Sequence, residues 1–276
     1  MIAMKLKLAL CQMKVETDKL KNLQTAAQLA QQAAQSGAQL ICLPEMFCCP
    51  YDNACFADYA ETMDGEIVHS LAEIARQAGC VLIGGSFPER EGGKLYNTSP
   101  AFSSKGNLLG RHRKLHLFDI DVEGGVRFQE SDVLTAGNSC TLIDTEYGKI
   151  GVAICFDVRF PELFRTMALR GADLVFLPGA FNPTTGPAHW ELTLRARALD
   201  NQLFVAACAP ALDPDASYHS YGHSLVADPW GRVVRQLDDR PGILLVTIDL
   251  KEVERVRREL PLLAARRPEL YGCESD

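Results

Sequence analysis

The stretch GKIGVAICFDVRFP, residues 148–161, joins an apolar segment to an abrupt polar turn. Residues 150–154 are small or β-branched, which is typical of a buried strand. The segment stops at Cys155, and two charged residues and Pro161 follow it. A proline fits the first turn of a new helix. Either Cys155 is a small core residue, or this strand-to-helix turn exists to present its thiol.

Similar apolar segments recur on both sides of this stretch, separated by amphipathic ones. The pattern predicts helices over 17–38, 66–79, 160–172, 187–202 and 251–260. It predicts strands over 6–12, 38–45, 80–87, 173–180, 203–209 and 242–250, and hairpins over 94–114, 140–155 and 223–237.

Strands that are apolar throughout, flanked by amphipathic helices, indicate sheets with helices on their outer faces. The hairpins indicate that these sheets are mixed rather than all parallel. Both halves of the chain show this alternation, and no linker interrupts it. The sequence therefore predicts an α/β fold, a four-layer αββα sandwich with two mixed sheets, in a single domain over residues 1–276.

Composition narrows the class of protein. A chain of 276 residues with 47% hydrophobic residues can bury a sizeable core. Its net charge of −7 argues against nucleic acid or an anionic membrane as a partner. The N-terminal apolar run is too short for a signal peptide, and no window has the roughly 18 apolar residues of a membrane helix. Several of the ten cysteines lie in apolar strands, which favours free thiols in a reducing compartment. We expect a cytoplasmic protein.

The sequence does not favour a metal site. Cys48, Cys49 and Cys55 form a local cluster, but no histidine or cysteine follows them at the spacing of zinc ligands. His112 and His116 flank Lys114 on a predicted strand, so they are not the helical histidine pair that often binds a metal. We expect neither a metal nor another cofactor.

Three of the predicted strands end on reactive side chains. The strand over 38–45 ends at Glu45, the hairpin over 94–114 ends at Lys114, and the hairpin over 140–155 ends at Cys155. Ligand sites in α/β proteins lie beyond the carboxyl ends of strands. If these ends meet, the carboxylate can take the proton of the thiol, and the ammonium can stabilise an oxyanion. The N–H of Phe156 would be a second oxyanion donor.

Such a set suits acyl transfer from an amide through a covalent cysteine intermediate. Each residue also has an ordinary structural explanation. Cys155 could be a packing residue, Glu45 a helix cap and Lys114 a surface charge. The spacing alone leaves both interpretations open.

Three motifs resemble the signatures of the nitrilase superfamily of carbon–nitrogen hydrolases. They are PEMF (44–47), HRKLHLFD (112–119) and ICFDVRFPE (154–162), and the similarity extends over about residues 5–271. Within the superfamily the chain looks like the ω-amidase branch. The stretches that carry this likeness are GKLYNT (93–98), HRKLHLFDIDV (112–122), FQES (128–131), GAFNPTTGPAHWE (179–191) and RRPELY (266–271).

The resemblance implies an αββα sandwich with a Cys–Glu–Lys triad. Glu45 would then be the general base, Lys114 the oxyanion donor and Cys155 the nucleophile. Glu130 matches a second glutamate that positions substrate and lysine, and Tyr51 matches an aromatic hydroxyl at the pocket mouth. The resemblance also implies a homodimer built on the face that carries the nucleophile, with the tail from about residue 261 at the dimer interface.

The chain departs from the pattern of the family at two points. Relatives often have tyrosine at the position of Phe156, but the oxyanion donor there is the backbone N–H. Cys48 and Cys49 replace a small polar pair, which leaves the pocket rim open to question.

The ω-amidase likeness implies ω-amides of dicarboxylic 2-oxo acids as substrates, 2-oxoglutaramate and 2-oxosuccinamate. Such a substrate carries a carboxylate at its far end, so the pocket should offer a cation or hydrogen-bond donors there. Arg159 is our candidate, with Thr184 and Thr185 as further candidates. Arg159 could instead form a salt bridge that fixes the turn.

Other functions are open at this stage. Another amidase of the superfamily would act on deaminated glutathione, an N-carbamoyl amine or a nitrile. A non-catalytic scaffold would have no reason to keep the three reactive residues. A glycosidase built on Glu45 and Glu130 would leave Lys114 and Cys155 without a role.

Overall fold

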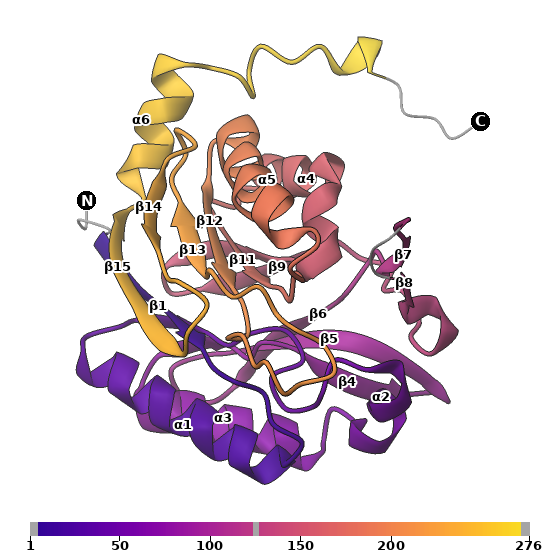
Figure 1. The fold of residues 1–276 in the computed structure, drawn as a ribbon. Helices are drawn as coiled ribbons and strands as arrows, with labels where there is room; N and C mark the ends of the chain where they lie inside the picture. Colours follow the sequence, from indigo (N-terminus) through magenta and orange to yellow (C-terminus); the bar gives the residue numbers. More distant parts are fainter. Residues whose placement is uncertain (1–4, 124–126, 272–276) are drawn as a thin grey trace.

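A computed structural model describes residues 5–123 and 127–271 of the chain. Its first sheet has seven strands in the order β15-β1-β2-β3-β5-β4, with β6 paired to β5 (Figure 1). Strands β1, β2 and β3 are parallel and the other pairings are antiparallel, so the sheet is mixed. The strands are β1 (Lys5–Gln12), β2 (Leu40–Cys42), β3 (Val81–Ile83), β4 (Phe87–Glu91), β5 (Lys94–Phe102), β6 (Leu108–Arg113) and β15 (Gly242–Asp249).

The second sheet has six strands in the order β14-β13-β12-β11-β10-β9, and it is also mixed because only β10, β11 and β12 are parallel. Its strands are β9 (Thr141–Thr145), β10 (Gly148–Val152), β11 (Leu174–Pro178), β12 (Phe204–Cys208), β13 (Leu225–Ala227) and β14 (Val233–Gln236). A separate small sheet pairs β7 (Asp119–Asp121) with β8 (Arg127–Gln129).

Helices cover the outer face of each large sheet. Helices α1 (Lys19–Gln35) and α3 (Glu66–Ala78) pack on the first sheet, and α4 (Pro161–Leu169) and α5 (Gly186–Asn201) pack on the second (Figure 1). Helix α2 (Asn53–Tyr59) lies near β4, and α6 (Lys251–Glu259) follows β15. This arrangement confirms the predicted αββα sandwich with two mixed sheets.

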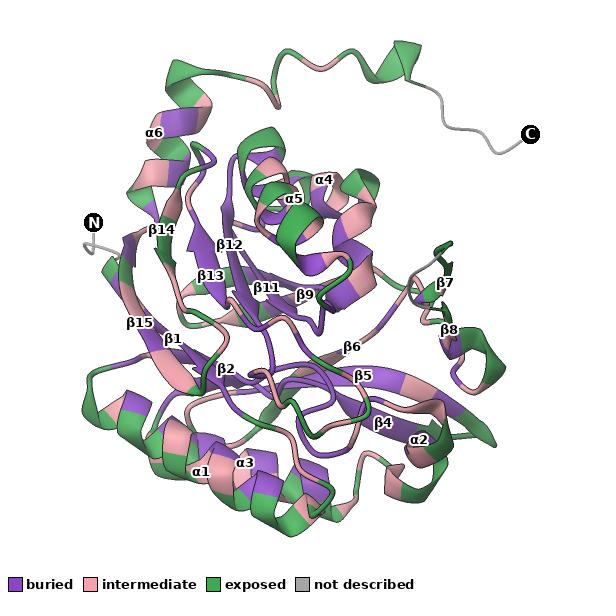
Figure 2. Ribbon diagram, viewed as in Figure 1, coloured by how far each residue is buried: buried purple, intermediate pink, exposed green. Residues whose placement is uncertain are grey.

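The alternation of side chains along each strand explains why the sheets are buried on both faces. On β1, Leu8 and Leu10 point into the core between the two sheets, whereas Ala9 and Cys11 pack toward the outer helices. On β10, Ile150 and Val152 face the same inter-sheet core. Figure 2 shows the central strands of both sheets as mostly buried, whereas β14 and β15 near the sheet edges are largely intermediate or exposed, as are the outer sides of the helices.

Most predicted elements are present, but several boundaries were wrong. The strand expected over 38–45 is only β2, and the strand expected over 80–87 is interrupted after β3. The cause is a close approach of two loops: Gly85 has φ +60°, and a Cβ there would lie 2.2 Å from the carbonyl oxygen of Pro44. Helix α2 and the sheet of β7 and β8 were not predicted, because they are short and lack a clear periodicity.

Across the described residues, the structure contains no helix that is both long and apolar enough to span a membrane.

Candidate active site

The three strand ends singled out in the sequence carry their side chains to one buried place. Glu45 lies three residues beyond the end of β2, Lys114 directly follows β6, and Cys155 opens a 3₁₀ turn, η2 (Cys155–Arg159), just beyond β10. Cys155 has φ +45°, a left-handed conformation that is uncommon for a residue with a side chain. Such strain persists where the surrounding structure holds it, and it often marks a functional turn.

Glu45 is fully buried and is held through both carboxylate oxygens. Its Oε1 accepts hydrogen bonds from Lys114 Nζ at 3.0 Å and from Asn97 Nδ2 at 2.8 Å. Its Oε2 accepts from the backbone N–H of Ala180 at 2.8 Å. These partners come from β5, the end of β6 and the loop after β11, so the position of the carboxylate depends on both large sheets.

Lys114 is also fully buried, and two carboxylates share its ammonium. Nζ lies 2.8 Å from Oε2 of Glu130 as well as 3.0 Å from Glu45. Glu130 in turn accepts a hydrogen bond of 2.6 Å from the hydroxyl of Tyr51 and one of 2.7 Å from the backbone N–H of Phe118. A buried ammonium with two hydrogen-bonded carboxylates satisfies the requirement that buried charges be paired.

Burial and these charges set the protonation of the site. Burial disfavours the ammonium of Lys114, but the charges of Glu130 and then Glu45 outweigh this and raise its pKa, so the lysine stays charged. Burial raises the pKa of Glu45; the charge of Lys114 opposes this rise and that of Glu130 adds to it.

The thiol has a raised pKa as well. Burial, and then the charge of Glu45 beside it, raise the pKa of Cys155 well above its usual range, while Lys114 opposes the rise. The resting thiol is therefore protonated, and an attack by sulfur requires a base to remove its proton as the bond forms. Glu45 is placed to be that base.

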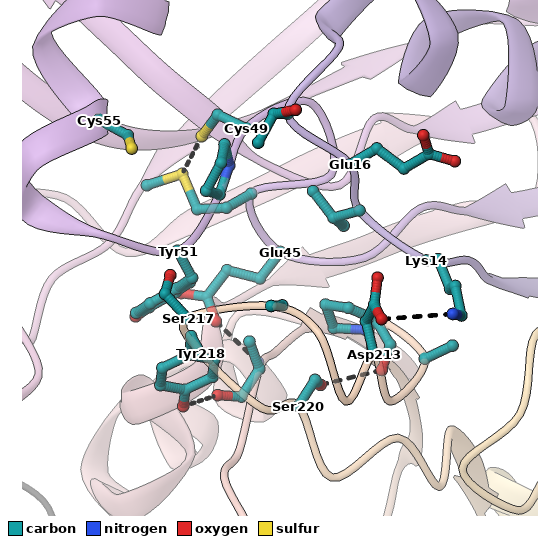
Figure 3. A pocket seen from close by; sticks show the side chains of 18 of the residues that line it. Lys14, Glu16, Glu45, Cys49, Tyr51, Cys55, Asp213, Ser217, Tyr218 and Ser220 are labelled. Carbon is teal, nitrogen blue, oxygen red and sulfur yellow. Dashed lines mark hydrogen bonds and ion pairs between the residues drawn. The ribbon is translucent and has the colours of Figure 1, made fainter.

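A cavity of about 530 Å³ borders this cluster through Glu45 and Tyr51, whereas Lys114, Glu130 and Cys155 lie behind its lining. Figure 3 shows Glu45, Tyr51 and Tyr218 close together on one side of the cavity, and Lys14 and Asp213 on another. The rings of Tyr51 and Tyr218 are 4.6 Å apart, and the hydroxyl of Tyr218 donates to the carbonyl oxygen of Ala180. The volume lies within the usual range for small-molecule sites.

Arg159, Thr184 and Thr185 lie outside the lining of this cavity. The Arg159 guanidinium lies over the rings of Phe156 and Phe181, with Cζ 5.5 and 5.1 Å from their centroids. Its Nη1 is 3.2 Å from His189 Nδ1, and its Nε is buried without a partner among the described residues.

The two threonines lie in a turn that Asn182 closes. The backbone N–H groups of Thr184 and Thr185 donate to Asn182 Oδ1, at 3.1 and 3.0 Å. The structure thus places Arg159 among aromatic rings in the turn that begins at Cys155, and the threonines in a local turn.

Sequence reasoning missed three groups of the site. Asn97 lies within the stretch GKLYNT, but nothing in the pattern showed that its amide would contact Glu45. Tyr218 lies in a long loop without periodicity. Asp157 was visible in the quoted stretch, but its contacts with the histidines on either side of Lys114 were not.

Within residues 5–123 and 127–271, no group of three or more His, Cys, Asp or Glu side chains is placed to hold a metal ion. Cys48, Cys49 and Cys55 are free thiols, and Cys49 and Cys55 form part of the cavity wall (Figure 3).

An αββα sandwich with a carboxyl, an ammonium and a thiol at the ends of its strands defines a class of amide-cleaving hydrolases. The model of the carbon–nitrogen hydrolase family matches residues 7–258, and the chain belongs to this family. It is 49% identical to omega-amidase NIT2 of Mus musculus over 269 residues, 98% of each chain. It is 46% identical to omega-amidase NIT2 of Homo sapiens over 268 residues, 97% of each chain.

Solved structures confirm the fold. Nit3 of Saccharomyces cerevisiae, a member of branch 10 of the nitrilase superfamily, matches with a TM-score of 0.88 at 38% identity over 96% of each chain. The NitFhit protein of C. elegans matches with a TM-score of 0.88 at 35% identity, over 98% of this chain and 67% of that chain. The predicted nitrilase superfamily is therefore confirmed.

Proposed function

We propose that this protein is an ω-amidase. It hydrolyses the terminal amide of 2-oxoglutaramate, 2-oxosuccinamate or a similar ω-amide such as succinamate, and it releases the dicarboxylate and ammonia. The observation that carries the proposal is the buried network of Glu45, Lys114 and Glu130 beside Cys155. The names of the relatives at 46–49% identity support the choice of substrate class.

In the first half of the proposed reaction, the sulfur of Cys155 attacks the amide carbon and Glu45 takes the thiol proton. Lys114 and the backbone N–H of Phe156 donate to the oxyanion of the tetrahedral intermediate. When the intermediate collapses, the C–N bond breaks, and the nitrogen leaves as ammonia with the proton that Glu45 returns. The product on the enzyme is a thioester.

In the second half, water attacks the thioester carbon and Glu45 takes a proton from that water. Collapse of the second tetrahedral intermediate breaks the C–S bond, frees the carboxylic acid and returns the proton to sulfur. Glu130 and Tyr51 keep the ammonium of Lys114 in place through both halves. One carboxyl therefore serves as base and then acid in each half of the reaction, which suits a group whose pKa is raised by burial.

The proposed substrates carry a second carboxylate, and Arg159 is the cation proposed to receive it. Its unpartnered, buried Nε and its position beside the ring of Phe156, one residue from the nucleophile, support this role. Thr184 and Thr185 are secondary candidates on the loop after β11.

The test is a steady-state screen of ammonia release from 2-oxoglutaramate, 2-oxosuccinamate and succinamate by the wild-type protein and Cys155→Ala. We expect turnover by the wild type and a loss of at least about 10³-fold in the variant. A nitrile, an N-carbamoyl amine and deaminated glutathione serve as comparison substrates. Preference for one of these would replace the ω-amidase proposal, and unchanged turnover by Cys155→Ala would end the mechanism.

We further propose a homodimer, with a single domain over residues 1–276 and its tail from about 261 at the dimer interface. Three observations support this proposal. Leu169 on α4 and Leu192 on α5 are large, apolar and exposed. The tail extends away from α6 across the end of the molecule that carries α4 and α5 (Figure 1). The two large sheets share one inter-sheet core, which supports the single domain.

A cytoplasmic location is also part of the proposal. All nine cysteines in the described part of the chain are free, and Cys273 lies outside the described residues. Free thiols in this number fit a reducing compartment.

A further inference from the structure

Asp157 is a fully buried carboxylate two residues beyond the nucleophile, and the proposed reaction does not use it. Its Oδ2 accepts hydrogen bonds of 3.0 Å from His112 Nε2 and 3.0 Å from the backbone N–H of Ile154. Its Oδ1 lies 2.8 Å from His116 Nδ1. An ionised carboxylate only accepts, so each histidine donates through the nitrogen that faces it.

The same carboxylate also holds the backbone just beyond Lys114. Oδ1 accepts from the N–H of Leu115 at 3.2 Å and from the N–H of His116 at 3.0 Å. Lys114 therefore lies between two segments that are both bound to Asp157, His112 on one side and Leu115 and His116 on the other.

We propose that Asp157, together with His112 and His116, positions Lys114 against Cys155. We call the side chains of Asp157, His112 and His116 the clamp. The clamp connects the end of β6 to the turn η2. This inference rests on the proposed roles of Lys114 and Cys155. The clamp would fix the distance and direction between the ammonium of Lys114 and the thiol of Cys155.

The rings of the clamp are themselves held in place. His112 Nδ1 lies 3.0 Å from Thr141 Oγ1 on β9, and the ring of His116 stacks on Phe160, with centroids 3.5 Å apart and planes 11° apart. Burial alone would raise the pKa of Asp157, but the hydrogen bonds from His112 and His116 outweigh it and hold the pKa well below its ordinary value. The carboxylate of Asp157 is thus held in the ionised form that accepts hydrogen bonds from both rings.

The left-handed backbone of Cys155 gives the clamp a physical task. The hydrogen bond from Ile154 N–H to Asp157 closes the turn that carries the nucleophile. The hydrogen bonds that Asp157 accepts from the two histidines connect this turn to the segment that carries Lys114. If the carboxylate is lost, both the turn and the lysine are free to move by a fraction of an ångström, and misplacement on this scale lowers rates strongly.

The main test is Asp157→Asn. The variant keeps the size of the side chain, but its NH₂ group faces groups that themselves donate hydrogen bonds. We expect kcat for succinamate to fall about 100-fold, with KM changed less than about threefold. We also expect alkylation of Cys155 by iodoacetamide, followed by mass spectrometry of its peptide, to slow about tenfold, because a displaced ammonium no longer favours the thiolate.

Two pairs of variants separate positioning from general support of the fold. His116→Asn keeps a donor at the place of Nδ1, and His112→Gln keeps one at the place of Nε2, whereas His116→Leu and His112→Leu keep none. We expect each conservative variant to retain a kcat at least about tenfold above that of its leucine counterpart.

The matched control is Asp173→Asn. Asp173 precedes β11 at the end of the sheet opposite to the site and pairs with Arg257 at 2.8 Å. This variant loses a partly buried carboxylate contact, so its melting temperature should fall while kcat and KM stay within twofold of the wild type.

Two results would overturn the clamp. One is an Asp157→Asn protein whose kcat, corrected for the folded fraction, lies within twofold of the wild type. The other applies if Asp157→Asn does not fold: equal kcat values for wild type, His116→Asn and His116→Leu. If the wild type releases no ammonia from any ω-amide while the alkylation rates still differ as expected, the proposed substrate is wrong and the clamp stands.

Discussion

At the scale of single residues, Lys114 decides the electrostatics of the site. Its ammonium is fully buried between the carboxylates of Glu45 and Glu130, so the three groups together carry a net negative charge. Burial of such a set is tolerated because each oxygen also accepts hydrogen bonds from neutral donors. The charge of Glu130 contributes to the raised pKa of Glu45, and a carboxyl with a raised pKa is better suited to take and return a proton.

Replacing Glu130 tests this balance. Below its pKa Glu45 is protonated and cannot take the thiol proton, so it sets the acid limb of kcat/KM. In Glu130→Gln a charge that raises the pKa of Glu45 is gone, and we expect the acid limb to move to lower pH. The measurement is a pH profile of kcat/KM for succinamate. An acid limb that stays in place, or moves to higher pH, would contradict the assignment of Glu45.

Replacing Arg159 tests recognition of the far carboxylate. Arg159→Met keeps an apolar side chain of similar length between Phe156 and Phe181 but removes the charge. We expect KM for succinamate to rise at least about tenfold, while KM for a neutral amide of the same length changes less than about twofold. Equal effects on both substrates would remove Arg159 from recognition and leave it as a support of the turn.

At the scale of secondary structure, local signals in the sequence fix where the helices begin and end. Asp18 caps α1, with its Oδ1 accepting from the N–H of Lys21 at 3.1 Å, and Gly79 ends α3 with φ +63°. Both residues act within one turn of chain, so the sequence narrows the choice to Thr17 or Asp18 for the start of α1 and to Gly79 for the end of α3. Strand ends behave differently, since β2 and β3 stop where two loops approach each other at Gly85 and Pro44.

The cap of α1 gives a prediction at this scale. Asp18→Ala leaves the N–H of Lys21 without a side-chain acceptor, and we expect a loss of about 1 kcal/mol in the free energy of unfolding. Asp18→Asn keeps an acceptor oxygen and should lose much less. Urea denaturation of the three proteins measures the difference, and equal stability of the alanine and asparagine variants would show that the cap does not contribute.

At the scale of the whole molecule, the exposed apolar side chains of α4 and α5 are the basis of the proposed dimer. Leu192 on α5 is 66% exposed and Leu169 on α4 is 50% exposed, so both helices present apolar surface that a second copy would cover in the proposed dimer. Leu20 on α1 is 53% exposed on the opposite outer layer and offers a matched control.

We expect Leu192→Glu to shift the protein from dimer to monomer, because a carboxylate at a contact between copies would lose its hydration. Leu20→Glu should remain a dimer. Light scattering coupled to size-exclusion chromatography measures both masses. A monomeric wild type, or a dimeric Leu192→Glu, would place the interface elsewhere or remove it.

The sequence by itself determined the layers of this protein and the three reactive residues of its proposed site. Apolar strands between amphipathic helices have few ways to bury both faces, and Glu45, Lys114 and Cys155 each stand at a predicted strand end. Only the tertiary structure brought Asn97 to Glu45, Tyr218 to Tyr51, and Asp157 to the two histidines. The physical reason is range: helix caps and strand faces depend on neighbours a few residues away, whereas these contacts depend on which strands lie side by side and on how two loops approach each other.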